Sequence, residues 1–220
     1  MKNAEFNIRK IEVQDLDGVV SIHRASFDDR ALTQLGAGAV RRYYHWLLTG
    51  FVEVHPICAV SAEGELAGFC FSGVYAGSFS GFLRKNKWYL AGNMLLKPWL
   101  LFNPLIREQA KSALSTLKRL VKHRKGINVG RQKEGSKKIK KGSSFGILSI
   151  AVDPAFQRCG VGAILENEVE RYALEQGYEQ IGLTVLPENT PAVKFYEKMG
   201  WEKTLTEDSW EGKMVKRLDN

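Results

Sequence analysis

The chain has 220 residues, of which 44% are hydrophobic and 25% charged, and its formal net charge is +8. This composition is typical of a soluble globular protein, long enough for one well-buried domain with an elaboration. Its three cysteines, Cys58, Cys70 and Cys159, lack the spacing of a zinc site or a disulfide framework, which argues against both. The first residues contain no apolar run of signal-peptide length. We therefore expect a cytoplasmic protein with no metal.

The first 75 residues predict a strand, two helices and a hairpin. Apolar residues alternate over residues 6–13 as in a strand, and they lie on one helical face over residues 15–25. A second helical pattern follows over residues 35–48. Residues 57–60 and 66–74 then predict two strands joined by a short polar turn.

Residues 76–142 differ in composition from the rest of the chain. Between Arg84 and Lys141 there are 17 Lys and Arg residues but only two acids, a local net charge of +15. The other 15 basic and 22 acidic residues give −7, so the positive excess comes from this segment. Its first part is aromatic and apolar. Residues 112–125 predict a basic amphipathic helix, and residues 125–142 predict a polar loop rich in Gly and Lys.

Four explanations compete for this segment. Solvated helices and a loop packed on the core are the simplest, because charge runs usually mark an exposed face. A lid that attracts an anionic substrate or partner is the second. A membrane-surface element is the third, although Lys97, Pro98 and Pro104 argue against a spanning helix. Nucleic-acid binding is the least favoured, because no recognised nucleic-acid motif accompanies the charge.

Residues 148–162, LSIAVDPAFQRCGVG, predict a phosphate-binding loop. An apolar strand leads into a glycine-containing loop, which opens a helix that extends through Ala173 and closes at Gly177. The backbone amides of residues 158–162 can converge on phosphate oxygens, and the positive end of the helix dipole adds to the attraction. The loop has neither the Lys-Ser/Thr of a Walker A motif nor the third glycine of a dinucleotide-binding turn. These features indicate a nucleotide-like ligand.

A second informative stretch is residues 181–201, IGLTVLPENTPAVKFYEKMGW. Residues 181–186 predict a mostly buried strand. Asn189 and Thr190 are candidate helix caps, and Pro191 suits a first helical turn. Gly200 is a favourable residue for the left-handed end of that helix.

Together the two stretches resemble the GNAT superfamily of N-acetyltransferases. Residues 157–162 match Q/R-x-x-G-x-G/A, and residues 189–201 match N-x-x-A-x-x-F-Y-E-x-x-G-W. The resemblance covers residues 1–75 and 143–220 and is specific in the second part. It implies an α/β fold with a mixed sheet, in which residues 1–220 form a single domain and residues 76–142 are a helical and loop insertion.

The resemblance also implies acetyl-CoA as cosubstrate. The pantetheine arm would bond to the backbone of Ile150, Ala151 and Val152, with the thioester carbonyl polarised near Ala151. Tyr196 would be the catalytic acid that protonates the coenzyme A sulfur. Asn189 would contact the pantetheine or order a water molecule, with helix capping as its alternative role. The remaining cofactor-binding residues form the loop: Gln157, Arg158, Cys159, Gly160, Val161 and Gly162.

The expected activity is direct transfer of an acetyl group from acetyl-CoA to a primary amine. The first choice of acceptor is an amino sugar or a nucleotide-linked sugar, and the second is a protein N-terminus or lysine. The rivals from other classes are a noncatalytic acyl-CoA-binding module and a nucleic-acid-associated protein. No general base is assigned, because residues 146–152 contain no acid. Five side chains elsewhere are open candidates, Asp28, Asp29, His45, Glu53 and His55, and a chain of water molecules would also serve.

Overall fold

The computed structural model describes residues 5–50, 53–74, 78–96, 145–205 and 209–218. Within them, seven strands form one sheet in the order β1-β2-β3-β4-β5-β7-β6. Neighbouring strands are antiparallel except β4 and β5, which are parallel. The expected mixed sheet of an α/β fold is therefore confirmed. The strands are β1 (Phe6–Lys10), β2 (Val54–Ser61), β3 (Leu66–Val74), β4 (Phe145–Val152), β5 (Gln180–Thr184), β6 (Glu202–Lys203) and β7 (Lys213–Arg217).

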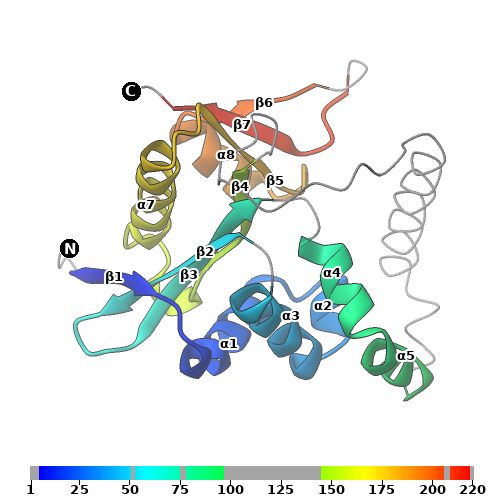
Figure 1. Ribbon diagram of the computed structural model, residues 1–220. Helices are drawn as coiled ribbons and strands as arrows, with labels where there is room; N and C mark the ends of the chain where they lie inside the picture. The colour runs from blue at the N-terminus through cyan, green and yellow to red at the C-terminus, as the bar shows by residue number, and fades with distance from the viewer. Residues whose placement is uncertain (1–4, 51–52, 75–77, 97–144, 206–208, 219–220) are drawn as a thin grey trace, which may run out of the picture.

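Helices cover both faces of this sheet, with α7 and α8 on one face and α1 and α3 on the other (Figure 1). Two further helices, α4 and α5, follow β3 and lie beside α3 (Figure 1). The helices are η1 (Val13–Asp15), α1 (Leu16–Ser26), α2 (Ala31–Gln34), α3 (Ala37–Thr49), α4 (Ser78–Lys85), α5 (Lys87–Leu96), η3 (Pro154–Phe156), α7 (Val161–Glu175) and α8 (Thr190–Lys198).

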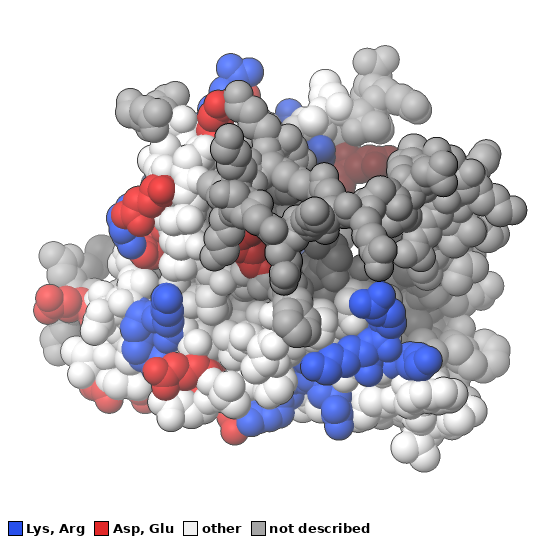
Figure 2. Space-filling model, in the orientation of Figure 1, with Lys and Arg blue, Asp and Glu red and all other residues white. Residues whose placement is uncertain are grey.

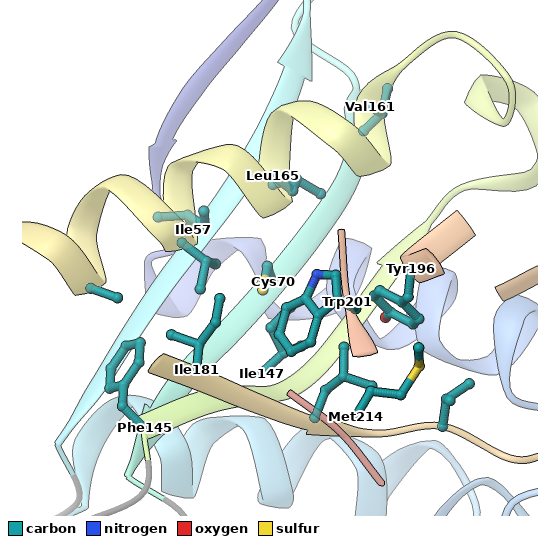
Figure 3. Close-up of a cluster of buried hydrophobic side chains, with 14 of the residues drawn as sticks. Ile57, Cys70, Phe145, Ile147, Val161, Leu165, Ile181, Tyr196, Trp201 and Met214 are labelled. Carbon is teal, nitrogen blue, oxygen red and sulfur yellow. The ribbon is translucent and has the colours of Figure 1, made fainter. Parts of the chain in front are cut away.

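The pattern of apolar residues explains how α7 is held. Val161, Leu165, Val169 and Ala173 recur every four residues, so they share one helical face, and all four are buried (Figure 3). This face packs on strand residues such as Ile57 and forms one core cluster with them. The opposite face of the sheet is covered in the same way by α1 and α3. The helix that begins after residues 157–160 is thus anchored along its whole length.

Several element boundaries differ from the sequence prediction. The first strand ends at Lys10 rather than at Val13, because Asp15 bonds to the Glu12 amide at 2.8 Å and forms an ion pair with Arg9 at 2.7 Å, turning the chain into η1. The second strand is longer than residues 57–60 because both of its edges are paired. The strand expected over residues 181–186 ends at Thr184, since the next amide bonds across to the chain before β7.

The described part of the insertion is only partly buried. Phe82 of α4 is 1% exposed and its ring lies 5.4 Å from that of Tyr43 in α3. In contrast Trp88, Leu95 and Leu96 of α5 are about 80% exposed. Among the described residues no helix has the length and apolar character needed to cross a membrane. The basic helix expected over residues 112–125 and the loop over residues 125–142 lie outside the described residues.

Candidate active site

The strands β4 and β5 meet at one end and separate at the other. Their only described pairing is between Gly146 and Gly182. The approach is close there, because a Cβ on Gly146 would lie 1.9 Å from the carbonyl oxygen of Gly182. Among the described residues, positions 148–152 of β4 have no partner in β5. This edge of β4 is therefore suited to an extended ligand that adds to the sheet as a strand would.

A β-bulge lies in β4 at the start of this open stretch. Phe71 of β3 pairs with Ser149, whereas the next residue, Ser72, pairs with Ile147. Leu148 therefore has no opposite residue in β3, which is the two-against-one count of a bulge. A bulge bends its strand locally, and this one coincides with the separation of β4 from β5.

The hydrogen-bond pattern after the bulge shows which backbone groups of β4 bond to β3 and which face the opposite edge of the strand. The amide of Asp153 donates to the carbonyl of Ala67 at 2.9 Å. By the alternation of an antiparallel ladder, Ala151 also bonds to β3, and Ile150 and Val152 direct their amide and carbonyl groups to the opposite side. Of the three residues expected to hold the pantetheine arm, Ile150 and Val152 are thus oriented for it. The Ala151 amide, expected to polarise the thioester, is directed to β3.

The loop after β4 has the conformation of an anion-binding turn. Arg158 and Gly160 both have positive φ angles, of 63° and 87°, and residues 157–160 are exposed. A turn in which left-handed residues alternate with others directs its successive backbone amides to one concave side. Gly160 is also the N-cap of α7, where no side chain caps the helix and no acid occupies the first turn. The first amides of α7 therefore lack a side-chain acceptor among the described residues, and an anion would satisfy them.

Small residues leave the surface above these amides uncovered. A Cβ added to Gly160 would have no atom within 4 Å. A Cβ on Gly162 would touch the ring of Phe195 at 3.4 Å, an ordinary contact. Packing alone therefore does not require glycine at position 162, and its absence of a side chain keeps the backbone accessible. Cys159, between Arg158 and Gly160, is an exposed free thiol.

Asn189 acts as the N-cap of α8. Its side-chain oxygen accepts a hydrogen bond from the Ala192 amide at 3.2 Å, and Pro191 lies in the first turn. The cap and the proline are those expected from the sequence, and Gly200 ends the helix region with a φ of 86°. Of the two roles considered for Asn189, the structure thus supports helix capping.

Tyr196 lies in the core cluster between α8 and the sheet. It is 7% exposed, and its ring is 5.8 Å from that of Trp201 and 5.2 Å from that of Phe195. Figure 3 shows Tyr196 beside Trp201, in the cluster that also contains Val161 at the start of α7. Because Phe195 also borders Gly162, the tyrosine is brought to the same end of the molecule as the loop.

A buried acid lies behind Tyr196 and was missed in the sequence. Glu166 of α7 is fully buried, and it accepts a hydrogen bond from the indole nitrogen of Trp201 at 2.7 Å. The ammonium of Lys216 lies 3.2 Å from the same oxygen and also pairs with Glu170. Burial raises the pKa of Glu166 to about 7, with Glu170 adding to the effect. The spacing of apolar residues predicted that position 166 lies in a helix, but only the tertiary structure brings Trp201 and Lys216 into contact with it.

Replacing Glu166 with glutamine is expected to remove part of the pH dependence of the protein's free energy of unfolding. The pKa of Glu166 in the folded protein lies above its ordinary value of 4.5, so the stability that its protonation contributes is fully present below pH 4.5 and is lost as pH rises through about 7. Glutamine can still accept from Trp201 and does not ionise. The free energy of unfolding of Glu166→Gln minus that of wild type should therefore rise between pH 5 and pH 8, measured by urea titration. A difference that stays constant over this range would contradict a raised pKa for Glu166.

One of the five candidate bases, His55, lies away from the loop of residues 157–162. His55 is buried and stacks on Tyr172 of α7 at 3.8 Å. Tyr172 is ten residues from Gly162 along the helix, or about 15 Å, so His55 is remote from the loop. The other four candidates are exposed side chains: Asp28, Asp29, His45 and Glu53.

A buried chain of hydrogen bonds, also missed in the sequence, ends on β4. Nδ1 of His23 in α1 lies 2.7 Å from the Tyr44 hydroxyl of α3, which lies 2.8 Å from Oγ of Ser149. Tyr44 is fully buried, and Ser149 is half-buried beside the bulge. Desolvation, with a smaller contribution from Arg30, lowers the pKa of His23 to about 4, so the imidazole is neutral at pH 7. The one available signal was that Ser149 is the single polar side chain of β4.

Comparison with known proteins agrees with this geometry. Residues 125–201 match the acetyltransferase (GNAT) family model. Over 72 residues the chain is 38% identical to an uncharacterized N-acetyltransferase of Methanocaldococcus jannaschii, a match that spans 33% of this chain and 31% of that protein.

Two solved structures have a similar fold at low sequence identity. The ribosomal-protein-S18-alanine N-acetyltransferase of Escherichia coli is 14% identical with a TM-score of 0.55, and the alignment covers 98% of this chain and 96% of that one. The PaiA N-acetyltransferase of Thermoplasma acidophilum, solved in complex with coenzyme A, is also 14% identical with a TM-score of 0.55, over 97% and 99% of the two chains. In its motifs, in its sheet and over residues 125–201, the chain is thus similar to the acetyltransferases of the GNAT family.

Proposed function

We propose that this protein transfers an acetyl group from acetyl-CoA to a primary amine in a ternary complex. The observation that carries the proposal is the uncapped start of α7, which lies behind an exposed turn with positive φ at Arg158 and Gly160. This turn follows β4 and η3, and positions 148–152 of β4 have no partner in β5 within the described part of the chain. A ligand with a pyrophosphate and an extended arm matches both features, because the first needs converging amides and the second needs a strand edge.

The roles of the residues follow from these positions. The pyrophosphate would bond to the amides of residues 158–162, and the pantetheine arm to Ile150 and Val152. Acetyl-CoA supplies an activated thioester. Tyr196 would donate its phenolic proton to the departing sulfur, since its helix is bordered by Gly162 through Phe195. Asn189 would fix the first turn of α8 and thereby the position of Tyr196.

We propose an anionic acceptor, such as a nucleotide-linked amino sugar. Figure 2 shows Lys and Arg side chains gathered over α4 and α5, next to α3. We refer to Arg42, Arg84, Lys85 and Lys87 as the basic group; Arg42 lies over the ring of Tyr89 at 4.2 Å, and Arg84 and Lys85 end α4. The basic group borders α3, whose Tyr44 reaches β4. Clustered like charges raise the local concentration of an oppositely charged substrate.

Replacing Arg84, Lys85 and Lys87 with serine is expected to raise the KM for an anionic acceptor and to flatten its dependence on salt. The reason is that long-range attraction between exposed charges is screened within about 10 Å at 0.1 M salt. The KM for acetyl-CoA should change little, which serves as the internal control. Steady-state kinetics from 20 to about 300 mM salt would measure both constants. Identical salt dependence in the two proteins would show that the basic group is a solvated part of the surface and does not attract the acceptor.

The experiment that tests the function is a turnover screen with acetyl-CoA. Thermal shift first measures binding, because a ligand that binds only the folded state raises Tm. Release of coenzyme A is then followed with glucosamine, a UDP-linked amino sugar, a peptide with N-terminal alanine and a lysine peptide. Turnover with one amine class identifies the acceptor class. A raised Tm without turnover in a broad amine library would instead indicate a noncatalytic acyl-CoA-binding module, and no Tm shift at millimolar acetyl-CoA would refute the proposal.

A further inference from the structure

The hydrogen bonds that link His23, Tyr44 and Ser149 have a direction of donation, which their geometry determines. Nε2 of His23 is buried and has no hydrogen-bond partner among the described residues. An unpartnered N–H inside a protein is rarer and costs more than an unpartnered acceptor. The neutral tautomer with its proton on Nδ1 is therefore favoured, so that His23 donates to the Tyr44 oxygen at 2.7 Å. Tyr44 in turn donates to Oγ of Ser149 at 2.8 Å.

This direction of donation leaves the hydroxyl proton of Ser149 pointing away from Tyr44. A hydroxyl has one proton and can accept two hydrogen bonds. With its oxygen accepting from Tyr44, Ser149 is a donor whose proton must find a partner elsewhere. Ser149 is half-buried and lies next to the bulged Leu148, where β4 leaves β5. Its side chain is on the face of α1 and α3, opposite the face that packs on α7.

We propose that Ser149 is a catalytic residue that donates a hydrogen bond to the acyl oxygen of acetyl-CoA, and that Tyr44 and His23 are positioning residues for it. This inference rests on the proposed acetyl transfer. As the C–N bond forms and the C–S bond breaks, the carbonyl electron pair moves onto the acyl oxygen and back. The ammonium nitrogen loses two protons: one goes to solvent before the attack, and the second leaves as the C–S bond breaks. The sulfur receives its proton from Tyr196, and the second nitrogen proton restores the phenol through solvent. Ser149 stabilises the charge on oxygen and loses no proton.

The surroundings of His23, Tyr44 and Ser149 support a role for Ser149 as a hydrogen-bond donor rather than as a general base. A base would have to carry the proton of the amine to His23, yet burial and the nearby guanidinium of Arg30 disfavour an imidazolium. Tyr44 is enclosed by the rings of Phe69, Phe71 and its neighbour Tyr43, and the charged group that acts on His23 is Arg30. A preorganised neutral donor, in contrast, needs no change in protonation during the reaction.

The test uses the full chain and [1-13C]acetyl-CoA, so that it does not depend on the acceptor. Isotope-edited infrared difference spectroscopy would compare the thioester carbonyl band in wild type and Ser149→Ala. We expect a lower frequency in wild type, because a hydrogen bond to the carbonyl weakens the C=O bond, and loss of that shift in Ser149→Ala. The matched control is Ser72→Ala, which removes another strand hydroxyl, bonded to the His55 carbonyl at 3.2 Å, and should leave the band unchanged.

Kinetics with the amine selected by the turnover screen provide the second measurement. Ser149→Ala should lower kcat about 100-fold to 1,000-fold, as for loss of an oxyanion donor. Tyr44→Phe should lower kcat about tenfold, and the double variant should be no slower than Ser149→Ala, since the tyrosine acts through the serine. Should Ser149→Ala not fold, Ser149→Cys gives the same comparison, because a thiol is a weaker donor.

The outcomes separate this inference from the proposed function. Equal carbonyl frequencies in wild type and Ser149→Ala, with acetyl-CoA bound to both, would overturn the role of Ser149 and leave the acetyltransferase assignment intact. A raised KM for the acceptor with unchanged kcat would also overturn it. Failure of wild type to bind acetyl-CoA would overturn the proposed function itself.

Discussion

Replacing Gly162 with glutamate is expected to abolish binding of acetyl-CoA. Gly162 lies in the first turn of α7, whose early amides have no side-chain cap. A carboxylate there would occupy the pyrophosphate position and repel it. The change should not unfold the protein, because an acid in the first helical turn interacts favourably with the helix dipole and a Cβ at this position makes only an ordinary contact with Phe195. Titration calorimetry and the thermal shift with acetyl-CoA would measure the loss.

Two control variants at the same position separate charge from bulk. Gly162→Gln has nearly the same size without the charge, so any affinity it retains over Gly162→Glu reports electrostatic repulsion. Gly162→Ala adds a single methyl group and should fold normally. Wild-type affinity in Gly162→Glu would mean that the pyrophosphate does not bind at the start of α7, and the assignment of the loop would then be wrong.

Replacing Tyr196 with phenylalanine is expected to lower turnover about 100-fold to 10,000-fold while affinity for acetyl-CoA stays near the wild-type value. The ring is 7% exposed and packs on Trp201 and Phe195, contacts that phenylalanine preserves. The loss should therefore arise from the missing phenolic proton rather than from the core. Steady-state kinetics and the affinity for acetyl-CoA, both as functions of pH, would measure it.

The matched control is Tyr172→Phe, which removes a phenol from α7 where the ring stacks on His55 at 3.8 Å. This variant should retain wild-type turnover, because it lies about 15 Å along the helix from the loop. Unaltered turnover of Tyr196→Phe at every pH would show that Tyr196 only packs in the core. The same loss in both variants would point to stability rather than chemistry.

The sequence by itself determined the features that depend on neighbouring residues. The cap at Asn189, the proline in the first turn of α8 and the left-handed Gly200 each follow from local backbone preferences. The four-residue recurrence from Val161 likewise placed one face of α7 in the core. The loop of residues 157–162 was recognisable for the same reason, since its amides and its helix belong to one short segment.

The tertiary structure alone decided which distant residues meet. His23 and Tyr44 are 21 positions apart and Tyr44 and Ser149 are 105 apart, yet their polar atoms lie within 2.8 Å. Trp201 and Glu166 meet across 35 positions. The bulge at Leu148 also depends on how β3 pairs with β4, and no local preference specifies that register. Such contacts form only when burial of both sheet faces brings the helices together, because spacing along a chain encodes its local geometry and not its long-range partners.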